Sequence, residues 1–182
     1  MKYSAVLLAV LYILIRIFLF YSGTNDDDYK YLVSLNLFFI VAGIALAMYE
    51  NYRSGTEKVY FPDEMKVAMR SVSYYAIILT LFTYIFYAYI DNGFGQRKMD
   101  VFRYELEQTD YSTKPDTENP LIVLGLTKEE FIEKEMEKVA SFVSPFTQAT
   151  LTLVGIIVAG MIYSLTLVFL RMKVLPLIFK KS

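Results

Sequence analysis

The sequence contains no cysteine, no histidine and no tryptophan among its 182 residues. The absence of cysteine excludes disulfides, thiolate nucleophiles, iron–sulfur sites and lipoprotein anchors. The absence of histidine removes the commonest general base and the commonest metal ligand. No Ser–His, Cys–His or metal-ligand pattern is present, so we predict that the protein is not an enzyme and has no catalytic residue, cofactor or metal site. The net charge of −1 gives no indication of nucleic-acid binding.

Hydrophobic residues, in contrast, make up 55% of the chain and are gathered into blocks. Such blocks are typical of membrane proteins, and their lengths suit helices that cross a bilayer. We predict a single membrane domain over residues 1–182, with spans at about 4–22, 31–49, 71–90 and 146–170. The fold class is therefore all-α, an integral membrane four-helix bundle. An extramembrane helical hairpin, formed by the insertion 91–144, lies between the third and fourth spans.

The first span has the length of a signal peptide, but its surroundings differ. Lys2 is the only charge before it, and Phe20 and Tyr21 stand where small residues precede a cleavage site. We therefore expect a retained helix.

The polar insertion contains two predicted helices. The first covers residues 96–108, and the second begins at Thr127, which forms a capping box with Glu130. Spacings of four, three and four residues give the second helix an apolar candidate interaction face of Ile132, Met136, Val139 and Val143. We expect this face to pack on the helix 96–108, with a protein partner as the second possibility and the membrane surface as the third.

The distribution of charge predicts the orientation of the four spans. Both termini and the connection 50–70 share one side, which carries nine Lys and Arg against four acids. The insertion 91–144 carries seven Lys and Arg against twelve acids. By the positive-inside rule we expect a multi-pass protein of the bacterial inner (cytoplasmic) membrane, with both termini cytoplasmic and residues 91–144 periplasmic.

Arg16 is a charge within the first span. It costs about 3 kcal/mol of insertion free energy at a span centre, so it is expected to have a partner. The nearest acids are Asp91, at the outer end of the third span, and the turn 26–28, which we otherwise interpret as solvated. We hypothesise an Arg16–Asp91 pair that joins the first and third helices. A contact with a substrate or an ion is the alternative.

Small residues spaced by four allow helices to approach closely. The fourth span contains two such pairs, and the second span has a patch of alanine and glycine that we expect to lie against them. The predicted helix-packing residues are Gly43 and Ala47 in the second span and Gly155, Ala159, Gly160 and Ser164 in the fourth.

The entries to the third and fourth spans carry the most distinctive local sequences. Pro62, followed by Asp63 and Glu64, predicts a helix start that runs directly into the third span. The segment 60–68, the charged insertion, the Ser-Pro-Phe entry at 144–146 and the basic tail together resemble an uncharacterised family of four-helix bacterial membrane proteins, typical of Bacteroidota and known as a domain of unknown function. This resemblance implies fold and location, and no catalytic residues.

The role we favour from the sequence is a non-catalytic accessory subunit or assembly and interaction partner of a larger membrane complex. Its expected contacts are the lipid bilayer and either a protein partner or further copies of itself. The alternative is a small homo-oligomeric transporter or channel, which would have to use Arg16, Asn36 and Gln148. A sensor is disfavoured because the sequence offers no cytoplasmic output domain.

Overall fold

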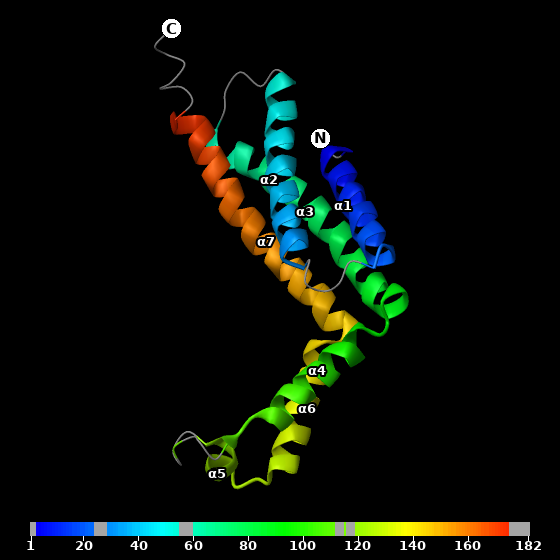
Figure 1. The fold of residues 1–182 in the computed structure, drawn as a ribbon. Coiled ribbons are helices and arrows are strands. Elements are labelled where there is room, and N and C mark those ends of the chain that lie inside the picture. Colours follow the sequence, from blue (N-terminus) through cyan, green and yellow to red (C-terminus); the bar gives the residue numbers. More distant parts are fainter. Residues whose placement is uncertain (1–2, 24–28, 55–59, 112–114, 116–118, 175–182) are drawn as a thin grey trace. The chain divides into compact units, whose positions relative to one another are not determined.

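The computed structural model describes residues 3–23, 29–54, 60–111, 115 and 119–174, and within these ranges it contains helices and no strand. This confirms the all-α prediction. The elements in chain order are α1 (Tyr3–Tyr21), α2 (Tyr29–Arg53), α3 (Phe61–Ile85), η2 (Phe86–Ile90), α4 (Phe94–Gln108), α5 (Pro120–Leu124), α6 (Lys128–Phe142), α7 (Pro145–Phe169) and η4 (Leu170–Val174) (Figure 1). The elements η2 and η4 are single π-helical turns.

Four helices in the described residues are long and apolar enough to cross a membrane, as the sequence predicted. They cover Tyr3–Tyr21, Tyr31–Arg53, Phe61–Ile90 and Pro145–Lys173. The third begins ten residues before the predicted span, because the helix that opens at Phe61 continues into the apolar segment without a break. Asp63 and Glu64 occupy its first turn, where carboxylates face the positive end of the helix dipole.

The chain divides into two compact units. The first unit is Met1–Phe82 with Leu151–Ser182, and the second is Thr83–Thr150. The second unit contains the whole of the predicted insertion 91–144. The helices α3 and α7 contribute residues to both.

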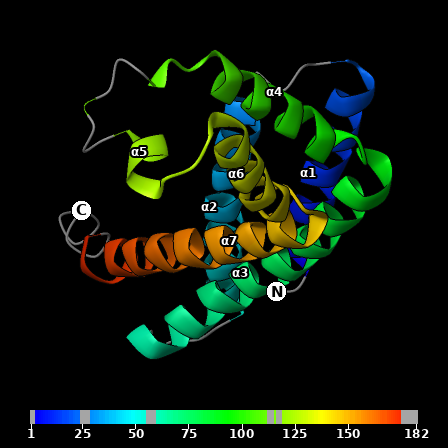
Figure 2. The same ribbon diagram turned by 90° about the horizontal axis from the view of Figure 1, so that it is seen from below.

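In the first unit, α1, α2, α3 and α7 lie side by side and share one hydrophobic core (Figures 1 and 2). Its buried members include Ala9 of α1, Ile44 of α2, Leu79 of α3 and Val168 of α7. The outward-facing side chains are also apolar, among them Leu7, Phe18, Phe38, Leu81, Ile162 and Phe169. Charged and polar groups such as Glu64 and Ser164 are buried instead. Apolar groups outside and polar groups inside are the arrangement that a lipid environment favours.

Gly160 of the fourth span meets a different helix from the one expected. A Cβ atom added at Gly160 would lie 2.3 Å from Cγ1 of Val72, so α7 meets α3 here and not the alanine–glycine patch of α2. Gly155, in the other predicted pair, is exposed, and no described residue lies within 4 Å of such a Cβ atom. Among the described residues Gly155 therefore packs on no other helix, and its role in helix packing stays a prediction. Of the remaining predicted residues, Ala47, Gly43 and Ser164 are buried and Ala159 is half-buried.

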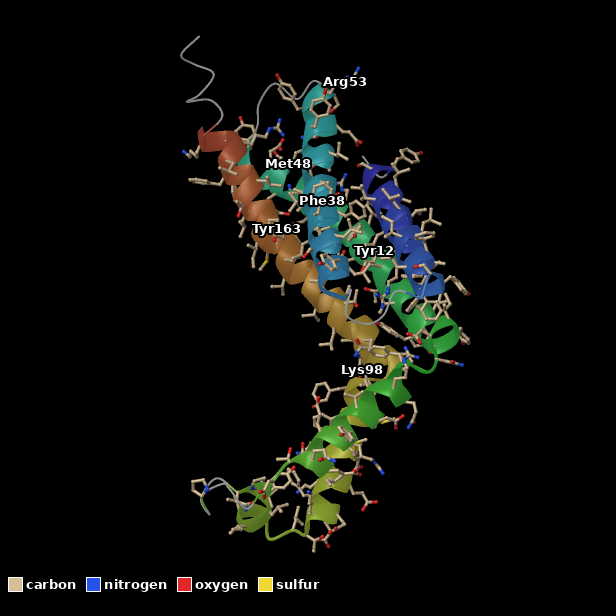
Figure 3. All side chains as sticks on the ribbon, viewed as in Figure 1. Tyr12, Phe38, Met48, Arg53, Lys98 and Tyr163 are labelled. Carbon is tan, nitrogen blue, oxygen red and sulfur yellow. The ribbon has the colours of Figure 1, made fainter. Side chains whose placement is uncertain are left out.

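In the second unit, α4 and α6 contact each other and run antiparallel. The start of α4 meets the end of α6, where Gly95 lies against Val143, with 3.5 Å between an added Cβ and Cγ2. All four residues of the predicted face, Ile132, Met136, Val139 and Val143, are half-buried. The predicted capping box is present: Thr127 accepts from the Glu130 backbone, and the Glu130 side chain accepts from the Thr127 backbone. Lys98, labelled in Figure 3, lies over the ring of Phe94, 5.7 Å from its centre.

Candidate functional site

Glu64 is the most deeply buried acid in the described part of the first unit, with 2% of its surface exposed. It lies in the first turn of α3, where Pro62 and the acids after it start the helix. Each carboxylate oxygen has its own donor. The Asn51 side-chain nitrogen donates to Oε1 at 3.0 Å, and Arg171 donates to Oε2 through Nη1.

Arg171 reaches this carboxylate from η4, after the end of α7. Its Nη1 also donates to the backbone carbonyl of Met48, 3.1 Å away, and its guanidinium carbon lies 5.4 Å from the centre of the Tyr52 ring. Met48, labelled in Figure 3, belongs to the last turns of α2. The side chains of Arg171 and Glu64 are 17% and 2% exposed, so both partners of the ion pair are shielded from water. The cluster therefore joins three helical segments at one end of the first unit.

Two further hydrogen bonds link α2 and α3 deeper in the same unit. Ser71 donates through Oγ to the backbone carbonyl of Gly43 at 3.0 Å, and the Tyr75 hydroxyl donates to Oδ1 of Asn36 at 2.7 Å. Glu64, Ser71 and Tyr75 follow one another at intervals of seven and four residues, so they share one face of α3. Together with Asn51–Glu64, these bonds form a polar ladder that sets the antiparallel register of the two helices.

Asp91 is the buried acid in the described part of the second unit, with 6% of its surface exposed. It follows η2, and its backbone nitrogen donates to the carbonyl of Phe86 at 2.7 Å. Arg97, in the first turns of α4, donates through Nη2 to both carboxylate oxygens at 2.9 Å. From the sequence we hypothesised an Arg16–Asp91 pair and did not consider Arg97 as a partner. Arg16 lies in the first unit, and its pairing with Asp91 stays a prediction.

A family model described as "Protein of unknown function (DUF4199)" matches residues 3–173. The chain belongs to this family. The match covers all four candidate spans and the whole second unit, and it confirms the resemblance to an uncharacterised family. No curated protein and no solved structure matches this DUF4199 protein.

The described residues of this DUF4199 protein hold no group of three or more Asp and Glu side chains placed to bind a metal ion. A shallow hollow on α6 is lined by Glu130, Glu133, Lys134 and Glu137, all of them exposed. The Glu130 side chain already accepts a hydrogen bond from the Thr127 backbone in the capping box. We interpret the hollow as part of a solvated acidic surface.

The polar cluster around Glu64 in this DUF4199 protein was not predicted from the sequence. Glu64 was interpreted as a helix-start acid and Arg171 as one of several tail cations, and they are separated by 107 positions. One signal was available. A carboxylate in a helix that continues directly into an apolar span needs a cation, and the end of the fourth span places Arg171 on the same side of the membrane.

Proposed function

We propose that this DUF4199 protein is a non-catalytic accessory subunit or assembly partner of a larger membrane complex. The four spans act as its anchor, and the second unit is the part that meets the partner. The observation that carries the proposal is the polar ladder. In it the side chains of Glu64, Ser71 and Tyr75 each form a hydrogen bond with a residue of a neighbouring helical segment. Paired groups of this kind hold helices in place, as an anchor requires.

The alternative is a homo-oligomeric transporter or channel, and it needs polar groups that can exchange partners with a passing substrate. Asn36, which that alternative would use, accepts a 2.7 Å hydrogen bond from Tyr75. Gln148 donates through Nε2 to the backbone carbonyl of Phe142 at 2.9 Å. Both residues thus already have roles within the fold, which favours the accessory role.

The first test is the composition of the native complex. We expect the tagged protein, extracted from its own membranes in mild detergent, to elute with a stoichiometric foreign subunit. The native mass should then equal a whole multiple of 21.1 kDa plus the mass of that subunit. An unrelated tagged four-span protein from the same membranes serves as the control and should not carry it. A native mass equal to a whole multiple of 21.1 kDa would contradict the accessory role and favour the homo-oligomeric alternative.

We further propose that the protein lies in the inner membrane of a bacterium, with both termini cytoplasmic and the second unit periplasmic. The support is the charge asymmetry, since short basic segments stay on the cytoplasmic side. Residues 91–144 carry twelve acids against seven Lys and Arg, the opposite of a cytoplasmic loop.

The natural lack of cysteine makes this orientation directly measurable. Ala140 of α6 and Ser54 after α2 are both exposed and small, so each can be replaced by cysteine with little disturbance. We expect a membrane-impermeant maleimide to label Ala140→Cys in spheroplasts, and to label Ser54→Cys only after the membrane is permeabilised. The reverse pattern would overturn the orientation, and the unsubstituted protein provides the background.

A further inference from the structure

The helix α5 is a short element of the second unit that is fixed at both ends. At its start, Oδ1 of Asn119 accepts from the backbone of Leu121 at 3.0 Å, while Nδ2 of Asn119 donates to the carbonyl of Tyr111 at 2.8 Å. At its end, Gly125 adopts the left-handed conformation with a φ of 63°, and Leu126 donates to the carbonyl of Leu121 at 3.0 Å. This is a Schellman closure, which satisfies the last carbonyls of a helix.

Tyr111, whose carbonyl accepts the hydrogen bond from Asn119, belongs to a small packed cluster. The rings of Tyr111 and Phe131 meet edge to face, with 5.6 Å between their centres, and both residues are buried. Lys128 donates through Nζ to the carbonyl of Glu107 at 2.6 Å and lies 5.7 Å from the Tyr111 ring centre. The segment that carries α5 is therefore tied to the end of α4 and the start of α6.

The helix α5 presents three consecutive large apolar residues to solvent. We call Ile122, Val123 and Leu124 the α5 tip, and their exposed fractions are 55%, 62% and 47%. The flanking residues Leu121 and Leu126 are half-buried, so the exposure is confined to the tip. Exposed apolar patches on an ordered scaffold mark interaction sites, and burying one such side chain is worth roughly tenfold in affinity.

The charges of the second unit restrict what can cover the tip. Glu129, Glu133 and Glu137 form an exposed row along α6, which begins four residues after Leu124. The insertion 91–144 as a whole has five more acids than Lys and Arg. An anionic lipid surface or a second acidic copy of the chain would be repelled, whereas a basic protein surface would be attracted.

We propose that the α5 tip docks into an apolar pocket on a basic extramembrane protein, and that the acidic row on α6 steers that partner. This inference rests on the proposed accessory function and names the surface and the partner chemistry that it uses. The tip supplies the apolar contact, and the acids supply orientation and a salt-dependent rate of association.

The test places a photo-crosslinking amino acid at Val123 of the full chain in its native membranes. We expect a cross-link to a different protein, at a peptide rich in Lys and Arg, with a yield that falls as salt is raised. Replacing Ile122 and Leu124 by serine should lower the yield at least about tenfold. Tyr104→Ser is the matched control, because Tyr104 is an equally exposed apolar residue of α4, and it should leave the yield unchanged.

Charge variants of α6 test the steering by the acidic row separately from the apolar contact of the α5 tip. Glu133→Lys with Glu137→Lys should lower the yield, and Lys134→Glu on the same helix should maintain or raise it. A cross-link to lipid, a cross-link to a second copy of the chain, or a yield insensitive to the serine variants would overturn the inference. If the native complex contains a foreign subunit to which the probe at Val123 does not cross-link, the α5 tip is not the docking surface, and the accessory function stands. If no foreign subunit is present, both fail.

Discussion

Replacing Arg171 with methionine is expected to lower the free energy of unfolding of the protein by about 3–5 kcal/mol. The substitution leaves the Glu64 carboxylate, 2% exposed, without its cation. Asn51 still donates one hydrogen bond, but it brings no charge. Methionine fills a similar volume, so the loss reflects the ionic contacts more than a cavity. The measurement is unfolding in mixed detergent micelles, followed by helical circular dichroism.

Two comparison variants show whether this loss comes from the unpaired carboxylate. Lys173→Met removes an exposed cation from the same π-helical turn and should change the unfolding free energy by no more than about 0.5 kcal/mol. The double variant Glu64→Leu with Arg171→Met removes both charges and should recover most of the stability. An Arg171→Met protein as stable as the unsubstituted one would show that the pair contributes nothing to the fold.

Replacing Gly160 with alanine is expected to destabilise the protein relative to the same replacement at Gly155, by about 1–3 kcal/mol. Both substitutions give α7 the same gain in helix propensity, so their difference isolates the packing effect. At Gly160 the new methyl group would lie 2.3 Å from Cγ1 and 2.8 Å from Cγ2 of Val72, and one helix must move. At Gly155 the described part of the chain places no atom within 4 Å of the new methyl group. The same micelle unfolding assay compares the two.

Val72→Ala provides the partner variant for this test. It removes both γ-carbons that the new methyl group would meet, so combining it with Gly160→Ala should cost less than the sum of the two single variants. Strict additivity, or equal stabilities of the Gly160→Ala and Gly155→Ala proteins, would contradict the close approach of α3 and α7.

The sequence by itself determined the features that depend on neighbouring residues. The four apolar helices, the start of α3 near Pro62 and the Thr127–Glu130 capping box were all predicted, and the structure contains them. Each depends on hydrophobicity or hydrogen bonding within a few turns of one helix, which the order of residues specifies directly.

The tertiary structure decided which residues meet across helices. Gly155 and Gly160 occupy equivalent motifs in one span, yet only Gly160 lies against another helix. Asp91 has the nearby Arg97 as its partner, whereas Glu64 has Arg171, 107 positions away. A helix that is apolar on all sides gives no sequence signal for the face that turns inward, because lipid and helix neighbours favour the same side chains. The rotation and pairing of the helices therefore depend on close packing and on buried polar contacts, which form only when the helices come together.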